Sequence, residues 1–454
     1  MNDSVKVKRE RAPAKEIFGW AMFDFANSSF TTVIITVVFA ELFPLIVGAD
    51  PNQSNPKLKY ALGNMLWAIT QSIGLFLVVI SGPLIGAIMD YSASKKKFLF
   101  VSYLITVLAS ACLYFVGPNS YGIGMIIIVI ALVGFYAGEN FVSSFLPDLG
   151  PPEDLGRISA YAWSLGYLGG LLSAGFITFV LGDAKIENFQ NMRFVGPITA
   201  VFFLLAAIPT FLLVKERGRA QVLPRGASYL KIGFQRLGQT LKEVRSFRDL
   251  MIFLIVIFFS FGGLNIIIAF AFIYGNQEIG WSGGTRILMF IITQFTAAGG
   301  ALLFGYIQDR IGAKKTFNMT LVLWIITITT IWGTEPLTKF LNSTLNTNWK
   351  MEHVFLIVAC LAGMGIGSTQ SASRAIVGIF SPESKSGEFF GLWGLAGKLS
   401  AIPGLLAVAY LQFMEIRLRE TILICTLFFV LALITNFFVN EEQGKKAALE
   451  HEGE

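Results

Sequence analysis

The sequence of 454 residues is poor in charged side chains, which make up 14% of it, whereas a soluble domain usually carries about 25%. Hydrophobic residues make up 54%, and the mean hydropathy is +0.65. A chain of this composition cannot expose most of its surface to water. A large soluble protein is therefore excluded, and the length fits roughly twelve bilayer crossings of about 20 apolar residues each.

Cysteine and histidine are also scarce. All three cysteines fall inside apolar runs, and His353 and His451 are the only histidines in the sequence. This pattern argues against a disulfide framework, a metal site and a His-Glu-x-x-His protease. Gly397-Lys398 resembles the end of a phosphate-binding loop but lacks the earlier glycine and the following Ser or Thr. We expect no metal, no cofactor and no enzymatic activity.

Long apolar runs predict twelve membrane-spanning helices. They cover about 17–47, 61–90, 97–117, 121–147, 157–182 and 193–214, then 250–275, 284–308, 315–334, 352–380, 387–412 and 420–439. The first run is too long for the apolar core of a signal peptide and has no small-residue cleavage site. We expect it to remain as a helix.

Lysine and arginine gather on one side of these predicted spans. They occur in the N-terminal arm, in the loop with Lys95, Lys96 and Lys97, in the loop after Asp309 and in the central connector. Positive segments are retained in the cytoplasm, so both termini and the connector are expected there. The membrane would be the plasma (inner) membrane in a bacterium. Membrane orientation thus explains the net charge of +6, and nucleic acid is not an expected partner.

The two halves of the chain repeat one another. Gly86-x-x-x-Asp90 ends the second predicted span and Gly305-x-x-x-Asp309 ends the eighth, each before a basic cluster. Two six-helix halves with the same orientation are the parallel-repeat plan of many secondary transporters. The predicted units are an N-terminal arm 1–16, a bundle 17–214, a basic connector 215–249, a bundle 250–439 and a solvated, flexible cytoplasmic tail 440–454.

The second copy of this repeat resembles the best-known motif of the major facilitator superfamily. The first copy departs from it, since Tyr91 stands where an arginine is usual and Ala93 or Ser94 where a glycine is usual. Three longer segments, 24–30, 157–170 and 367–398, resemble the vacuolar amino-acid effluxer-like (autophagy-related effluxer) branch of that superfamily. In the first of them, Asp24-Phe-Ala-Asn27-Ser-Ser-Phe30, a phenylalanine replaces the tryptophan of the branch signature.

This resemblance implies an all-α membrane protein with the major facilitator fold, in which twelve helices form two pseudo-symmetric six-helix bundles. It further implies proton- or gradient-linked movement of a solute, with amino-acid export attributed to fungal members.

Ionisable groups inside a span are costly in lipid, so each needs a partner or a hydrated passage. Asp24 and Glu139 are candidates for proton coupling; the alternatives are a polar helix contact for Asp24 and a buried ion pair for Glu139. Lys398 lies about eleven residues into its span, near the midplane, and should meet a protein carboxylate or an anionic group of the substrate. The residues predicted to bind substrate are Asn27, Asn140, Gln370, Lys398, Trp163, Tyr167 and Trp393.

A cytoplasmic gate is the interpretation of the charges near the inner ends of the spans. Arg374 is expected to bond with Asp309 and Glu388, although substrate contact is the alternative for it. Asp90 would form the matching gate in the first half, and Arg310 belongs to the same cluster as Asp309.

Together these patterns predict a uniporter or proton-coupled carrier, working by alternating access on a small polar or zwitterionic solute, amino acids first. The expected partners are this solute, protons and membrane lipid, and the expected state is a monomer. Because the chain contains 42 phenylalanines, a carrier of lipid-like amphiphiles is an alternative interpretation. A membrane-embedded enzyme or a non-transporting receptor is less favoured, because no His/Cys/Asp cluster and no long soluble loop is found.

Overall fold

The computed structural model describes residues 9–49, 51, 60–182, 184–218, 221, 223, 228–242 and 246–452. The first eight residues of the predicted arm, parts of the predicted connector and the last two residues of the predicted tail lie outside this range. Within it, every regular element is a helix.

The helices of the first half precede the connector. They are α1 (Ala14–Ser29), α2 (Phe39–Val47), α3 (Ala61–Tyr91), α4 (Lys95–Cys112), α5 (Tyr121–Ser143), α6 (Leu155–Leu181), α7 (Phe189–Met192), α8 (Val195–Ala206) and α9 (Ile208–Leu213). The connector contains α10 (Tyr229–Lys242). The second half consists of α11 (Arg248–Tyr274), α12 (Gly283–Ile311), α13 (Ala313–Trp332), α14 (Thr334–Leu345), α15 (Met351–Phe380), α16 (Ser386–Leu399), α17 (Ala401–Phe413), α18 (Leu418–Thr421), α19 (Ile424–Phe437) and α20 (Glu441–Glu452).

The prediction of an all-α protein with twelve spans is confirmed. In the described part of the chain, eleven helical segments are long and apolar enough to cross a membrane. A twelfth span is the pair Ala14–Val37 and Phe39–Val47, which is bent by 42°.

This first span is not the continuous α-helix that its apolar run suggested. After α1 the chain widens into a π-helix over Phe30–Val37 and then bends. Residues 31–38 are all β-branched, and such side chains crowd one another in the tighter turns of an α-helix. Short π-helical segments within α-helices are frequent at functional sites, and this one begins three residues after Asn27.

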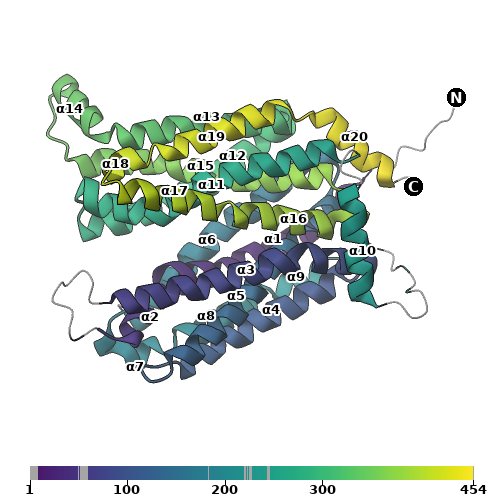
Figure 1. Cartoon of the computed structure of the whole chain (residues 1–454), viewed down its shortest axis with the longest axis horizontal. Coiled ribbons are helices and arrows are strands. Elements are labelled where there is room, and N and C mark those ends of the chain that lie inside the picture. The colour runs from purple at the N-terminus through teal and green to yellow at the C-terminus, as the bar shows by residue number, and fades with distance from the viewer. Residues whose placement is uncertain are drawn as a thin grey trace.

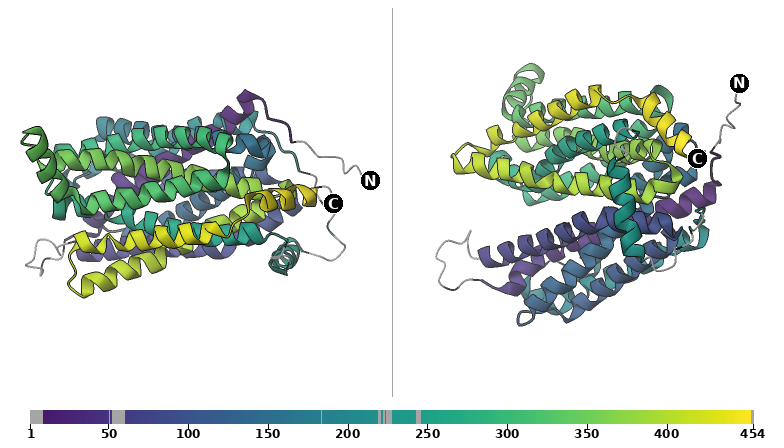
Figure 2. Two further views of the ribbon diagram at one scale, coloured as in Figure 1. Left: turned by 90° about the horizontal axis from the view of Figure 1, so that it is seen from above. Right: turned by 45° about the vertical axis from the view of Figure 1, so that its right-hand side comes forward.

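The two halves form two bundles that lie side by side (Figure 1). Helix α10 crosses one end of the molecule, where α20 also lies (Figures 1 and 2); we call this the connector end. Between the bundles, α3 packs on α16 and α6 on α12. The α3–α16 contact depends on glycine, because a Cβ on Gly86 would overlap the carbonyl oxygen of Gly387.

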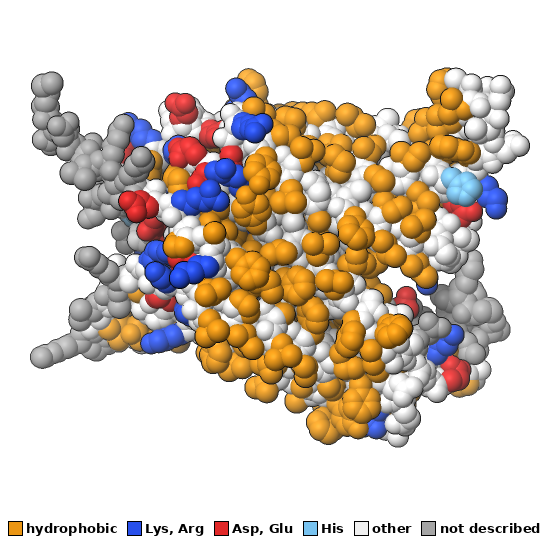
Figure 3. All heavy atoms as spheres, turned by 180° about the vertical axis from the view of Figure 1, so that it is seen from behind, with side chains coloured by type: hydrophobic (Ala, Val, Ile, Leu, Met, Phe, Trp, Pro, Cys, Tyr) orange, Lys and Arg blue, Asp and Glu red, His pale blue; other side chains and the backbone are white. Residues whose placement is uncertain are grey.

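On the face shown in Figure 3, apolar side chains cover the middle of the molecule and charged side chains gather toward its two ends, more of them at the connector end. Phe179 and Phe413 are 89% and 81% exposed. Large exposed apolar surfaces of this kind are stable against lipid tails, where helices satisfy their own backbone hydrogen bonds. The chain is therefore a multi-pass integral membrane protein.

The predicted flexible tail is instead largely the helix α20. The carboxylate of Glu441 accepts the backbone N–H groups of Ala313 and Lys314, both at 2.9 Å, so it caps α13. An anion at a helix N-terminus is favoured by the helix dipole. Further along α20, Lys445 forms an ion pair with Glu153 of the first half. The prediction of a flexible end is thus wrong for 441–452, which form a helix.

Candidate functional site

Arg374 on α15 is the most completely buried cation of the site, with 1% of its surface exposed. Its Nη1 lies 2.6 Å from Oδ2 of Asp24 on α1, and its Nε and Nη2 donate to the hydroxyl and carbonyl oxygens of Ser159 on α6, at 3.1 and 3.0 Å. The guanidinium carbon lies 4.9 and 5.0 Å from the ring centres of Trp20 and Trp163. A buried charge is tolerated when it is both paired and hydrogen-bonded. Arg374 therefore joins the second half to α1 and α6 of the first.

The partner of Arg374 differs from the one expected. The sequence interpretation placed Arg374 with Asp309 and Glu388, whereas its observed ion pair is with Asp24. Arg374 and Asp309 differ in how far they lie from the connector ends of their helices. Arg374 precedes the end of α15 by six residues, roughly 9 Å along the axis, whereas Asp309 is close to the end of α12.

Lys398 on α16 makes the second ion pair of the site. Its Nζ lies 3.3 Å from Oε2 of Glu139 on α5 and 4.8 Å from the ring centre of Tyr136. Of the two alternatives open for Lys398, a protein carboxylate is thus the observed contact. The two side chains are 11% and 25% exposed, so this pair is more accessible than Arg374. The helix is interrupted just beyond Lys398, since Pro403 cannot donate a hydrogen bond to the carbonyl of Leu399.

Both ion pairs join the first half to the second. The four groups carry two positive and two negative charges, so their sum is zero. The site sits where α1 and α5 of the first half meet α15 and α16 of the second.

Aromatic and amide groups line the same region. The Tyr167 hydroxyl on α6 donates to Oε1 of Gln370 on α15, and the rings of Trp163 and Tyr167 lie 6.0 Å apart. Four buried polar atoms have no hydrogen-bond partner among the described residues: Oδ1 of Asn27, Oδ1 of Asn140, Nε1 of Trp163 and Nε1 of Trp393. The structure thus brings Asn140, Trp163, Tyr167, Gln370 and Lys398 to the contact between the halves. Asn27 and Trp393 are buried, and Trp393 packs against Phe261 and Phe390 of its own half.

Asp309 joins the second half to the first at the connector end. Its Oδ2 lies 2.9 Å from Nε of Arg157 and 3.2 Å from the backbone nitrogen of the same residue, at the start of α6. Arg310, predicted to share this gate, is exposed and forms no ion pair within the described ranges.

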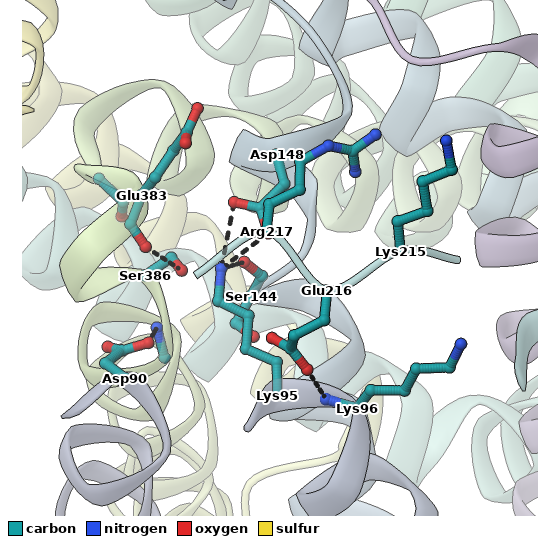
Figure 4. Close-up of polar contacts among 12 residues, drawn as sticks. Asp90, Lys95, Lys96, Ser144, Asp148, Lys215, Glu216, Arg217, Glu383 and Ser386 are labelled. Atoms are coloured by element: carbon teal, nitrogen blue, oxygen red, sulfur yellow. Dashed lines mark hydrogen bonds and ion pairs between the residues drawn. The ribbon is translucent and has the colours of Figure 1, made fainter. Parts of the chain in front are cut away.

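Asp90 makes the corresponding contact from the first half (Figure 4). Its two carboxylate oxygens accept the backbone N–H groups of Gly387 and Glu388, at 3.0 and 2.9 Å, at the start of α16. Glu388 is fully buried there. A carboxylate at a helix N-terminus binds both the free N–H groups and the positive end of the helix dipole.

Sequence reasoning missed several residues that hold this end together. It counted Lys95 only as an orienting charge, yet Lys95 is buried, with its Nζ 2.9 Å from Oδ2 of Asp148 (Figure 4). Arg9 of the N-terminal arm donates to the carbonyl oxygen of Ser381 at 3.1 Å and so reaches the second half. Hydropathy treats every loop cation as solvated, so it gave no signal for these contacts. Arg157 begins the family-like segment 157–170, but sequence reasoning gave this residue no role.

The comparisons with known proteins agree with this geometry. A family model described as vacuole effluxer Atg22 like matches residues 64–449. The "Uncharacterized MFS-type transporter YxiO" of Bacillus subtilis is 26% identical over 435 residues, covering 94% of this chain and 95% of the relative. "Autophagy-related protein 22" of Kluyveromyces lactis is 24% identical over 344 residues, covering 73% of this chain and 67% of the relative.

Solved structures share the fold at low sequence identity. The MFS proton:xylose symporter XylE superposes with a TM-score of 0.70 at 16% identity, over 97% of this chain and 98% of that one. The MFS transporter FucP in its outward conformation gives a TM-score of 0.67 at 13% identity, over 93% and 98%. The predicted major facilitator fold is confirmed.

Proposed function

Because the chain belongs to the vacuole effluxer Atg22-like family of major facilitator transporters, we propose that it carries a small zwitterionic or polar solute, amino acids first, by alternating access. The observation that carries this proposal is the ion pair between Lys398 and Glu139, next to the one between Arg374 and Asp24. This family and fold are those of carriers, not of enzymes.

The charge balance of the site supports a zwitterion. A strongly anionic or cationic solute would leave one excess charge in a region that holds two cations and two anions, at a high cost in a low dielectric. An amino acid can instead bind by replacing each partner of the Lys398–Glu139 ion pair with one of its own charged groups. Its carboxylate takes the place of Glu139 beside Lys398, its ammonium group binds the released carboxylate, and the sum of charges stays zero.

The accessible pair is the better candidate for proton coupling. Protonation of Glu139 would remove the attraction that holds Lys398 and free the ammonium group for the solute. Asp24 is bonded to the buried Arg374 and so would act mainly in joining the halves. The tilted rings of Trp163 and Tyr167, with Gln370, Asn27 and Asn140, would orient the solute by hydrogen bonds and cation–π contact.

The arrangement of contacts supports alternating access. Hydrogen bonds and ion pairs join the halves from the connector end as far as Tyr167 on α6 and Lys398 on α16. Toward the opposite end the helices of the two bundles diverge (Figure 1). We infer an outward-facing state in which the connector end, rich in lysine and arginine, lies in the cytoplasm.

A carrier of lipid-like amphiphiles is the alternative, and one feature favours it. An apolar pocket in the second half is lined by α11, α12 and α15, with Ile267, Met289 and Phe355 among its residues. A pocket of this character suits an acyl chain better than an amino acid.

Transport by purified protein in proteoliposomes tests the proposal. We expect exchange of at least one radiolabelled amino acid, a loss of more than tenfold in Lys398→Ala, and no dependence on an imposed pH gradient in Glu139→Gln. Lys339→Ala is the control, because Lys339 is a solvent-exposed lysine whose partner is Glu335 of the same helix, α14.

The outcomes separate the alternatives. Wild-type rates in Lys398→Ala would exclude its contact with the carboxylate of the solute. Movement of a labelled lysophospholipid without movement of any amino acid would replace the amino-acid proposal with the amphiphile one.

A further inference from the structure

The two gates at the connector end differ in charge. In one gate Arg157 at the start of α6 bonds Asp309. Gly387 is the repeat counterpart of Gly156, so Glu388 stands in the place of Arg157, and its backbone N–H donates to Asp90.

The first copy of the motif also lacks its usual arginine, since Tyr91 follows Asp90. Lys95 is the nearby cation of this half; its ammonium group is bonded to Asp148, and its charge also acts on the carboxylate of Asp90. The Asp90 gate therefore lacks both the arginine that is usual after this aspartate and a counterpart of Arg157.

The connector helix α10 brings a cation to this position. Arg236 lies with its guanidinium carbon 6.0 Å from the ring centre of Tyr91, and its Nη2 donates to the carbonyl oxygen of Ser384 in the second half at 3.2 Å. Its positive charge also acts on the carboxylate of Asp90. One side chain thus contacts both halves.

The rest of α10 is fixed to the first half. The Tyr229 ring meets the Tyr91 ring edge-on at 6.5 Å between centres. Gly233 lies so close to Leu84 and Ile88 of α3 that a Cβ would come within 2.8 Å of each. The helix lies across the ends of the spans (Figure 2), so it can move with α3 while the contact to Ser384 opens.

We propose that α10 is the third element of the gate, and that Arg236 replaces the missing motif arginine as a releasable clamp between the halves. This role concerns closure of the connector end and does not rest on the identity of the solute. Opening requires the hydrogen bond from Arg236 to Ser384 to break, whereas the contact with Tyr91 is kept.

Labelling of a single cysteine tests the clamp. Ser386 is fully buried at this end, so Ser386→Cys, in protein whose three native cysteines are replaced by serine, reacts with a charged maleimide only when the end opens. Full-length protein in lipid nanodiscs is used, and size-exclusion chromatography and melting temperature confirm that each variant is folded.

We expect Arg236→Ala to raise the labelling rate two- to fivefold, the effect of losing a partly exposed charged contact, and Arg236→Lys to raise it less. Lys231→Ala is the matched control, because Lys231 is an exposed cation of the same helix. Its labelling rate should equal that of the unchanged protein. Adding Tyr91→Arg to Arg236→Ala should restore slow labelling.

Three results would each overturn the proposal. The first is an unchanged rate in Arg236→Ala, and the second is an equal rise in Lys231→Ala, which would indicate a general effect of charge. The third is a double variant that labels as fast as Arg236→Ala, which would mean that a cation beside Asp90 is not what closes this end.

Discussion

Asp90 and Asp309 occupy equivalent places in the two halves. Each ends a long helix, and each carboxylate accepts backbone N–H groups at the start of a helix in the other half: Gly387 and Glu388 for Asp90, and Arg157 for Asp309. The two carboxylates thus join the halves at the connector end by the same interaction with helix N-termini. In the alternating-access cycle that we propose, both contacts break when this end opens.

Loss of either charge should affect the transport cycle more than solute binding. Asp309→Asn and Asp90→Asn keep an acceptor oxygen but lose the attraction to the helix N-terminus, and Asp309→Asn also loses the ion pair to Arg157. We expect the maximal rate in proteoliposomes to fall at least fivefold while KM stays within about twofold. A raised KM with an unchanged maximal rate would place these residues in the solute site instead.

Removing the cation that faces Asp24 should destabilise the protein strongly. Arg374→Ala leaves a buried carboxylate without its partner, a change that costs about 3–5 kcal/mol. The double variant Asp24→Asn with Arg374→Met removes both charges and should lose much less. Thermal denaturation in detergent measures the difference, and a double variant as unstable as Arg374→Ala would contradict the pairing.

The loop after Asp90 should gain stability from a glycine. Ala93 has a φ of +45°, and its counterpart in the second half, Gly312, has a φ of +98°. Side chains strain the backbone at positive φ, whereas glycine does not. Ala93→Gly is expected to raise the unfolding free energy by up to about 1 kcal/mol and Gly312→Ala to lower it by at least that much. Melting temperatures that move in the opposite directions would refute the assignment of Ala93 to the glycine position of the motif.

The tail helix should stabilise the second bundle through one side chain. Glu441→Ala removes the acceptor of two backbone N–H groups at the start of α13 and should lower the unfolding free energy by about 1 kcal/mol. Glu442→Ala serves as the control, since Glu442 is exposed and adjacent. Equal melting temperatures for these two variants would show that α20 does not depend on the cap.

Much of the architecture was predictable because it depends on local composition. A run of about 20 apolar residues has to cross the bilayer as a helix, so the spans follow from hydropathy alone. The repeat of Gly86 and Asp90 at Gly305 and Asp309 indicated two like-oriented halves. The bend after Phe30 was missed, because hydropathy does not distinguish an α-helix from a π-helix.

The sequence predicted which charged residues belong to the candidate site, but it did not predict how they pair. Asp24, Glu139, Arg374 and Lys398 stood out because a charge inside an apolar run is costly. The sequence left open whether Lys398 meets a protein carboxylate, and it gave Arg374 the wrong partner.

The sequence by itself determined that this chain crosses the membrane as helices and which charged residues lie within them, since both follow from the free energy of transfer into lipid. The internal repeat added that the helices form two matched sets. Only the tertiary structure decided that Arg374 meets Asp24 and Lys398 meets Glu139, partners 350 and 259 positions apart. Such pairs depend on the rotation and depth of each helix and on its neighbours. Packing sets those quantities, and no short stretch of sequence encodes them.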